Sequence, residues 1–172
     1  MNDNIFLIGF MGAGKSTVAR CLHRCYGREM LEMDGVIEER EGMQISRIFE
    51  TYGEEYFRRL ETGILLELQE RENLVISCGG GAPLRACNVE AMKKSGKVVF
   101  LTATPETVLE RVRNSHDRPV IEQNKNAGFI AELMEQRREK YEAAADATVA
   151  TDGRRPEEIC GEIMEKILKF QN

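Results

Sequence analysis

The chain is poor in the residue types that build metal centres and disulfide frameworks. It has two histidines, His23 and His116, which lie too far apart in the sequence to suggest a local metal-binding motif. Its five cysteines are odd in number and lack the close paired spacings of a zinc site or a secreted disulfide scaffold. We therefore expect reduced thiols and a cytoplasmic location, and we do not expect His-rich zinc or non-haem iron chemistry.

The chain also lacks long apolar runs and an excess of positive charge. No segment approaches the ~20 apolar residues that a membrane helix needs. The uncharged run 5–14 follows Asn2-Asp3-Asn4 rather than basic residues, which is not typical of a signal peptide. With 24 Lys and Arg against 29 Asp and Glu, the net charge is −5, which argues against binding nucleic acid or a membrane with the whole surface. Net charge says nothing about one pocket for a small anion.

What is present is the composition of one globular domain. The 172 residues are 42% hydrophobic and 31% charged, and we expect a single domain over 1–172. Short apolar runs alternate with longer helical patterns, which predicts an α/β fold with a parallel sheet and helices on both faces. Ligands in such folds bind beyond the carboxyl ends of the strands. The predicted strands cover 5–8, 30–33, 74–78, 97–101 and 148–150. The first predicted helix follows Ser16, and short helical pieces span 34–53. Further helices are predicted over 54–72, from Pro105, over 129–144 and from Pro156.

Residues 114–128 interrupt this alternation with fifteen mostly polar residues. The segment holds Asp117, Arg118 and Pro119 and closes with a glycine, which is typical of a mobile loop. Arg118 has the position of a lid arginine that closes over a transferring phosphoryl group, and an ordinary surface arginine is the alternative.

The strongest motif is Gly9-Phe10-Met11-Gly12-Ala13-Gly14-Lys15-Ser16, between a predicted strand and an amphipathic helix. It fits the P-loop pattern, whose glycines let backbone N–H groups and the helix dipole surround phosphate oxygens. In this pattern Lys15 neutralises the β- and γ-phosphates, and the Ser16 hydroxyl reaches magnesium. The alternative, a glycine-rich turn with an exposed lysine, does not explain the strand and helix on either side.

Two acids follow the second predicted strand. Glu32 and Asp34 are two residues apart, so on an extended segment both carboxylates point the same way. Beside a P-loop, such a pair can position magnesium and accept a proton from an attacking hydroxyl. The alternative is a solvated acidic turn. No Asn-Lys-x-Asp guanine signature is present.

Arginines and glycines elsewhere suggest where an anionic substrate binds. Arg137 lies within the apolar stripe of its predicted helix, so either a structural carboxylate or a bound ligand must supply its partner. Arg58 and Arg59 flank the stripe of the 54–72 helix on opposite sides, and periodicity does not choose between them. Residues 79–81 are three glycines at a strand end, where a ligand can approach the backbone closely.

Together these features closely resemble the shikimate kinase family from Ile5 to Pro156. The resemblance rests on GFMGAGKST, on Glu32-Met33-Asp34, on the run IEEREGMQISRIFETYGEEYFRRLE over 37–61, and on CGGG, DRP and Arg137-x-x-x-Tyr141. It implies transfer of the ATP γ-phosphoryl group to the 3-hydroxyl of shikimate, in aromatic amino-acid biosynthesis. It also implies a nucleoside monophosphate kinase fold with a five-stranded parallel sheet in order 2-3-1-4-5, a substrate-binding helical segment at about 34–61 and a lid at about 114–128.

The resemblance further assigns residue roles. Asp34 would bind the substrate hydroxyls and act as base, while Arg58 and Arg137 would hold its carboxylate. The ligands would be ATP, Mg²⁺ and shikimate, and we expect a monomer that binds neither nucleic acid nor membrane. The substrate would also be bound by the backbone of Gly79, Gly80 and Gly81. The phosphates would be bound by Gly12, Ala13, Gly14, Lys15, Ser16 and Thr17, and Arg118 would stabilise them from the lid. Two arginines would lie near adenine: Arg111 and Arg154, with Arg155 as the alternative to Arg154.

One residue departs from the family pattern, and other functions stay open. The family commonly has Asp-x-Asp at the second strand end, and here the first acid is Glu32, for which we expect a water-mediated role at magnesium. A sister kinase acting on gluconate or a nucleoside monophosphate is the nearest alternative, and the run 37–61 favours shikimate by resemblance. A weak nucleotide-binding regulator is a further alternative, against which the intact Lys15, Ser16, Asp34 and Arg118 argue.

Overall fold

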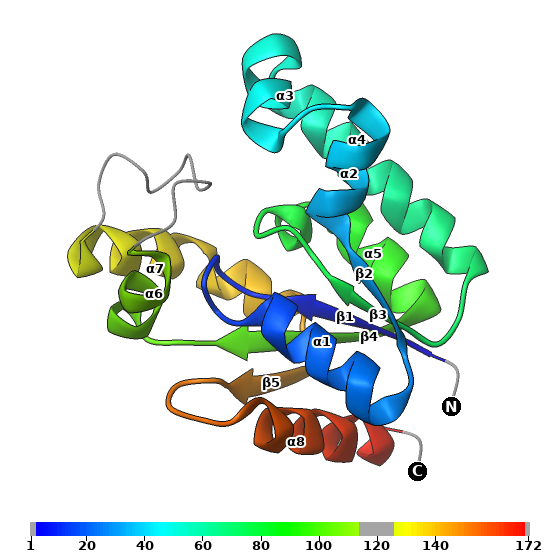
Figure 1. Ribbon diagram of the computed structural model, residues 1–172, viewed down its shortest axis with the longest axis vertical. Helices are drawn as coiled ribbons and strands as arrows, with labels where there is room; N and C mark the ends of the chain where they lie inside the picture. Colours follow the sequence, from blue (N-terminus) through cyan, green and yellow to red (C-terminus); the bar gives the residue numbers. More distant parts are fainter. Residues whose placement is uncertain (1–2, 114–125, 171–172) are drawn as a thin grey trace.

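A computed structural model describes residues 3–113 and 126–170 of the chain. It contains a five-stranded sheet in the order β2-β3-β1-β4-β5, in which every adjacent pair is parallel (Figure 1). The predicted fold class and strand order are therefore confirmed. The strands are β1 (Asn4–Ile8), β2 (Glu29–Glu32), β3 (Leu74–Ser77), β4 (Gly96–Thr102) and β5 (Ala147–Ala150).

Most helices are close to their predicted positions, but α5 (Ala86–Ser95), between β3 and β4, was not predicted. Two smaller differences are that the 54–72 helix ends at Glu67 and continues as a short 3-10 turn, and that the 129–144 helix begins two residues earlier. The helices are α1 (Lys15–Tyr26), α2 (Met33–Glu41), α3 (Ile45–Tyr52), α4 (Glu54–Glu67), α5 (Ala86–Ser95), α6 (Pro105–Val112), α7 (Ala127–Ala144) and α8 (Pro156–Lys169), with 3-10 turns η1 (Leu68–Glu70) and η2 (Ala82–Leu84).

Alternation along the central strand explains the layers. Ile5 and Leu7 of β1 face one hydrophobic cluster, while Phe6 and Ile8 face a second. The first cluster includes side chains of α1 and α8, and the second includes side chains of α4, α5 and α7. Both faces of the sheet are thus covered, which is why the strands read as continuous apolar runs. In Figure 1, α2, α3 and α4 rise beyond the β2 edge of the sheet.

Two loop predictions are wrong in detail. The strand was expected to run through Met33, with Glu32 and Asp34 on one extended segment, but β2 ends at Glu32 and α2 begins at Met33. Met33 and Ile37, four residues apart, are both fully buried, and this helical spacing overrides the extended reading. Residues 127 and 128 were expected in the polar loop, but they open α7, whose start is capped by the Asn126 side chain accepting from Phe129 N at 2.8 Å.

The rest of the predicted loop, including Arg118, lies outside the described residues. All five cysteines are free thiols. Of the described helices, none combines the length and apolarity needed to cross a membrane.

Candidate active site

The first half of the site is the loop between β1 and α1. Gly12 and Gly14 adopt φ values of 78° and 101°, which side chains rarely tolerate, so the loop folds back over the first turn of α1. A Cβ at Gly9 would lie 2.5 Å from the carbonyl oxygen of Leu101, so the loop also packs closely on β4. The Lys15 ammonium donates to the carbonyl oxygens of Gly9 at 2.6 Å and Phe10 at 3.2 Å.

This loop fits a nucleotide phosphate. Its glycine conformations and the amino end of α1 direct backbone N–H groups to one place, and Lys15 adds a positive charge. Ser16 and Thr17 occupy the first turn of α1 and are exposed. The conformation of the loop is thus suited to a polyphosphate.

Arginines from two other elements flank the loop. Arg111 of α6 donates to Gly12 O at 3.0 Å and to Thr151 Oγ1 at 3.2 Å, so it joins the loop to the segment after β5. Arg154 donates to Ala150 O at 2.8 Å and forms an ion pair with Glu162 at 2.7 Å. Both predicted adenine-side residues therefore lie on elements that border the loop or the end of β5.

The second half of the site gathers around the three glycines that follow β3. Each glycine lies against different charged groups, as the position of an added Cβ shows. At Gly79 a Cβ would lie 2.7 Å from Glu61 Oε2 and 3.0 Å from Asp34 Oδ1. At Gly80 it would lie 3.6 Å from Arg137 Nη1, and at Gly81 it would overlap the Arg58 guanidinium. The glycines are therefore the surface on which three predicted substrate residues, from α2, α4 and α7, come together.

Arg58 is held by two carboxylates of its own helix. Its Nη1 donates to Glu61 Oε1 at 2.6 Å, and its Nε and Nη2 donate to Glu54 Oε1 at 3.4 and 3.3 Å. The Arg58 side chain is largely buried, whereas Arg59 is exposed. The ambiguity between the two arginines is thus resolved in favour of Arg58 as the one at the glycine segment.

Arg137 has a different environment. Its guanidinium carbon lies 5.6 Å from the centre of the Phe10 ring, a cation–π contact with the nucleotide loop. Tyr141, one turn further along α7, donates its hydroxyl to Gly80 O at 2.6 Å and so ties the helix to the glycine segment. Within residues 3–113 and 126–170, no carboxylate forms an ion pair with Arg137.

The electrostatics of Cys78 show how close the two halves are. Burial raises the pKa of the Cys78 thiol, the positive charge of Lys15 lowers it, and the carboxylates of Glu61, Asp34 and Glu32 raise it further. Charged groups from α1, α4, α2 and β2 thus all act on the residue that precedes the glycines. The end of β3 is where the nucleotide half and the glycine half meet.

Glu61 is a site residue that the sequence analysis missed. It is fully buried, and burial raises the pKa of its carboxyl group, an effect that Arg58 opposes and Asp34 reinforces. Its Oε2 has no hydrogen-bond partner among the described residues. Glu61 stands between Phe57 and Ile64 on the buried face of α4, so an acid within the apolar stripe was the available signal.

The site offers oxygen donors for a divalent cation. Glu32 and Asp34 act electrostatically on the same residue as Lys15, and the Ser16 hydroxyl lies beside Lys15 in the sequence. Because α2 begins at Met33, the two acids do not share one extended segment as expected, and Asp34 instead lies in the first turn of α2. Among the described residues, no three His, Cys, Asp or Glu side chains form a metal cluster. A small number of oxygen ligands from the protein suits Mg²⁺, because this ion is usually bound through one or two protein side chains together with the phosphates of the substrate.

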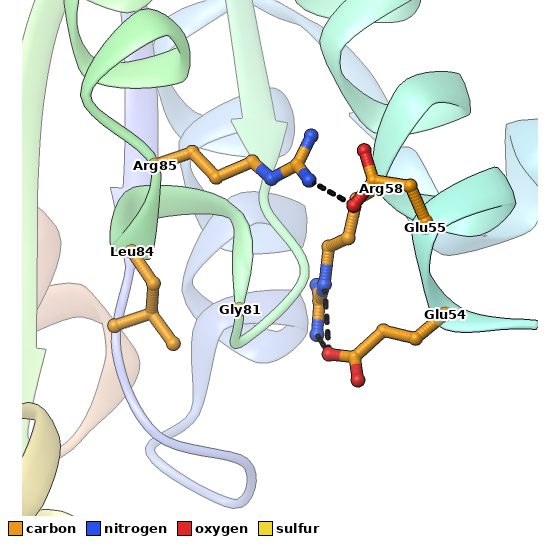
Figure 2. A pocket seen from close by; sticks show the side chains of 6 residues that line it. All are labelled: Glu54, Glu55, Arg58, Gly81, Leu84 and Arg85. Carbon is orange, nitrogen blue, oxygen red and sulfur yellow. Dashed lines mark hydrogen bonds and ion pairs between the residues drawn. The ribbon is translucent and has the colours of Figure 1, made fainter.

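A cavity of about 380 Å³ opens on the outer side of Arg58. Figure 2 shows Arg85 reaching across to Glu55 of α4, whereas Arg58 meets Glu54 of its own helix. Arg85, just before α5, pairs with Glu55 at 2.5 Å, so it connects α4 to the segment after the glycines. The cavity is lined by Glu54, Glu55, Arg58, Gly81, Leu84 and Arg85.

Comparisons with known proteins agree with this geometry. Residues 11–168 match the family model described as shikimate kinase. The chain is 38% identical over 170 residues to a shikimate kinase of Dehalococcoides mccartyi, covering 99% of this chain and 96% of the relative. It is 42% identical over 164 residues to one from Sulfurihydrogenibium, covering 95% and 97%.

Solved structures give the same result. The shikimate kinase of Acinetobacter baumannii in complex with shikimate matches with a TM-score of 0.91 at 38% identity, covering 98% of this chain and 94% of that one. A gluconokinase from Sinorhizobium meliloti matches with a TM-score of 0.60 at 19% identity, covering 98% and 93%, which shows a shared fold.

Proposed function

The chain belongs to the shikimate kinase family, and we propose that it transfers the γ-phosphoryl group of ATP to the 3-hydroxyl of shikimate, yielding shikimate 3-phosphate and ADP. This reaction is a step of aromatic amino-acid biosynthesis. The observation that carries the proposal is the pair of guanidinium groups, Arg58 and Arg137, at one glycine segment beside a phosphate-binding loop. Arg137 has a cation–π contact but no ion pair within the described residues, and its proposed partner is a ligand carboxylate.

Each residue of the nucleotide half has a defined task. The backbone N–H groups of residues 12–17 surround the phosphates, and Lys15 neutralises charge on the β- and γ-phosphates. Ser16 and, through water, Glu32 would hold magnesium, which would neutralise charge on the phosphates. Arg111 and Arg154 lie on the adenine side, and Arg118, outside the described residues, is the proposed lid arginine.

The glycine half orients the acceptor. Arg58 and Arg137 fix the substrate carboxylate, and the backbone of Gly79, Gly80 and Gly81 lets the ring approach closely. This places the reacting hydroxyl at Asp34, whose carboxylate accepts the hydroxyl proton as the oxygen attacks phosphorus. Phosphoryl transfer depends mainly on such positioning and charge stabilisation, so these contacts supply most of what the reaction needs.

The organisation of the chain is part of the proposal. The chain acts as one domain over 1–172, in which the helical segment 34–61 binds the acceptor and the residues that precede α7 form a lid. It acts as a monomer in the cytoplasm, without nucleic-acid or membrane partners, and its free cysteines support a reducing location.

The test is an ADP-release assay with shikimate, gluconate and AMP offered in turn. We expect ATP- and Mg²⁺-dependent turnover with shikimate well above the ATP-only background and above the other two acceptors. Turnover with gluconate or AMP and none with shikimate would overturn the proposal. An Asp34→Asn variant should bind shikimate with near-normal affinity and lose most of its kcat, since it keeps the shape of the side chain and removes the base.

A further inference from the structure

The two carboxylates on Arg58 hold it in unequal ways. Glu61 accepts from Nη1 at 2.6 Å and its side chain is fully buried, so it is a fixed part of the fold. Glu54 accepts from Nε and Nη2 at 3.4 and 3.3 Å, and its side chain is 67% exposed. Figure 2 shows Glu54 at the end of the Arg58 guanidinium, among the residues that line the cavity. One carboxylate is therefore permanent, and the other is within reach of solvent and ligand.

The hydrogen bonds that Glu54 accepts from Arg58 are longer and involve fewer oxygens than those of a well-placed carboxylate ligand. The Nε–Nη2 edge of a guanidinium binds a carboxylate best through two parallel hydrogen bonds of about 2.7–2.9 Å, one to each oxygen. Here a single oxygen of Glu54 receives both N–H groups, at distances near the limit for a hydrogen bond. The exposed position of Glu54 also weakens its ion pair with Arg58, because solvent screens the charge of the carboxylate. A ligand carboxylate that used both oxygens would make better hydrogen bonds to this edge than Glu54 does.

We propose that Glu54 is an intramolecular competitor for the substrate carboxylate. It occupies the Nε–Nη2 edge of Arg58 in the empty site, and a ligand must replace it with its own carboxylate. Glu54 thereby lowers the affinity for every ligand that uses this edge. It disfavours most the ligands that present a carboxylate in the wrong place, because these cannot displace it. The inference rests on the proposed function for the identity of the ligand, and the residue acts on affinity and selectivity rather than on the chemical step.

Glu55 provides a matched control. It shares the first turn of α4 with Glu54, so neutralising either residue removes one negative charge and the same favourable interaction with the helix dipole. Both line the cavity and both are about equally exposed. Glu55 pairs with Arg85 and makes no hydrogen bond to Arg58 in the described structure. The two substitutions therefore differ in the Arg58 contact.

The experiment is calorimetric titration of shikimate into the nucleotide-free protein at low salt. An exposed pair of this kind is worth a factor of about two to five in an equilibrium constant. We expect Glu54→Gln to bind shikimate about two- to five-fold more tightly than the wild type. Glu55→Gln should stay within about 1.5-fold of the wild type. In an Arg58→Ala background, Glu54→Gln should make no difference, because the contested edge is absent.

Three results would overturn the inference. Unchanged or weaker shikimate binding by Glu54→Gln would mean that Glu54 positions Arg58 or does nothing. If Glu54→Gln and Glu55→Gln increased the affinity for shikimate equally, the cause would be a general charge effect. The same would hold if Glu54→Gln still increased this affinity in the Arg58→Ala background. If the wild type bound no shikimate, the proposed function itself would fall, whereas wild-type binding with a wrong Glu54→Gln result would remove this inference alone. Glu54→Ala repeats the measurement should Glu54→Gln fold poorly.

Discussion

The nucleotide half and the glycine half of the site, which is the acceptor half in the proposed reaction, are assembled in opposite ways. The phosphate loop comes from eight consecutive residues, 9–16, which connect β1 to the start of α1. Its shape is set by the backbone conformations of its glycines. The acceptor half draws Asp34 from α2, Arg58 from α4 and Arg137 from α7 to the glycine segment 79–81. A local motif carries its own geometry, whereas a dispersed site depends on packing between helices. The two halves should therefore fail differently when residues are changed.

Lys15→Met should have the largest effect and should be confined to the nucleotide half. Lys15 is proposed to supply the charge that stabilises the transferring phosphoryl group, so we expect kcat to fall by about 100-fold or more. Shikimate affinity measured by calorimetry without nucleotide should change by less than about threefold. A kcat loss below tenfold, or a comparable loss of shikimate affinity, would show that the halves are not separable.

Arg137→Ala should have the next largest effect, in the acceptor half. Removing charge-assisted hydrogen bonds worth about 1.5–3 kcal/mol should raise the KM for shikimate about 10- to 100-fold. The KM for ATP should stay within about twofold, and Arg137→Lys should restore part of the loss. Because no described carboxylate pairs with Arg137, the melting temperature should hardly change. A large drop in melting temperature with an unchanged KM would identify a structural role instead.

Gly81→Ala and Gly80→Ala should differ in their effect on the KM for shikimate, although the two glycines are neighbours. A Cβ at Gly81 overlaps the Arg58 guanidinium, which Glu61 pins in place, so Arg58 must leave its position. At Gly80 the nearest side-chain atom would be 3.6 Å away, an ordinary contact. We expect the KM for shikimate to rise about tenfold in Gly81→Ala and less than about threefold in Gly80→Ala. Equal KM values for the two variants would contradict the close approach of Arg58 to Gly81.

Glu61→Gln should produce the smallest effect, visible as a change in pH dependence. Burial raises the pKa of Glu61 above its ordinary value of 4.5, although the neighbouring Arg58 opposes this shift. Its contribution to stability is present below pH 4.5 and is lost as the pH rises through the folded pKa. The free energy of unfolding of the wild type relative to Glu61→Gln should therefore fall from pH 4.5 toward neutrality. Urea titrations at several pH values measure this, and a difference that rises with pH would contradict it.

The nucleotide half could be predicted almost completely from the sequence. Residues 9–16 carry their own spacing signal, and the apolar runs predicted the strands because strands buried on both faces must be apolar. The strand order came from the family resemblance and is confirmed.

The acceptor half was predicted by residue type but not by geometry. The start of α2 at Met33 was missed because the burial of Met33 and Ile37 is a tertiary effect that a four-residue pattern does not reveal. Glu61 was missed because an acid on a helix is normally read as exposed. The Glu54 contact depends on the rotamer of Arg58, which is set by the buried Glu61. These are contacts between side chains, and no local periodicity encodes them.

The most direct test compares shikimate with its methyl ester as phosphoryl acceptors for the wild-type protein. The ester keeps the hydroxyls and the ring and removes the negative charge that Arg58 and Arg137 are proposed to bind. The account predicts that kcat/KM for the ester is lower than for shikimate by about 100-fold or more, since two guanidinium groups lose their anion. Equal kcat/KM values for the two acceptors would contradict it.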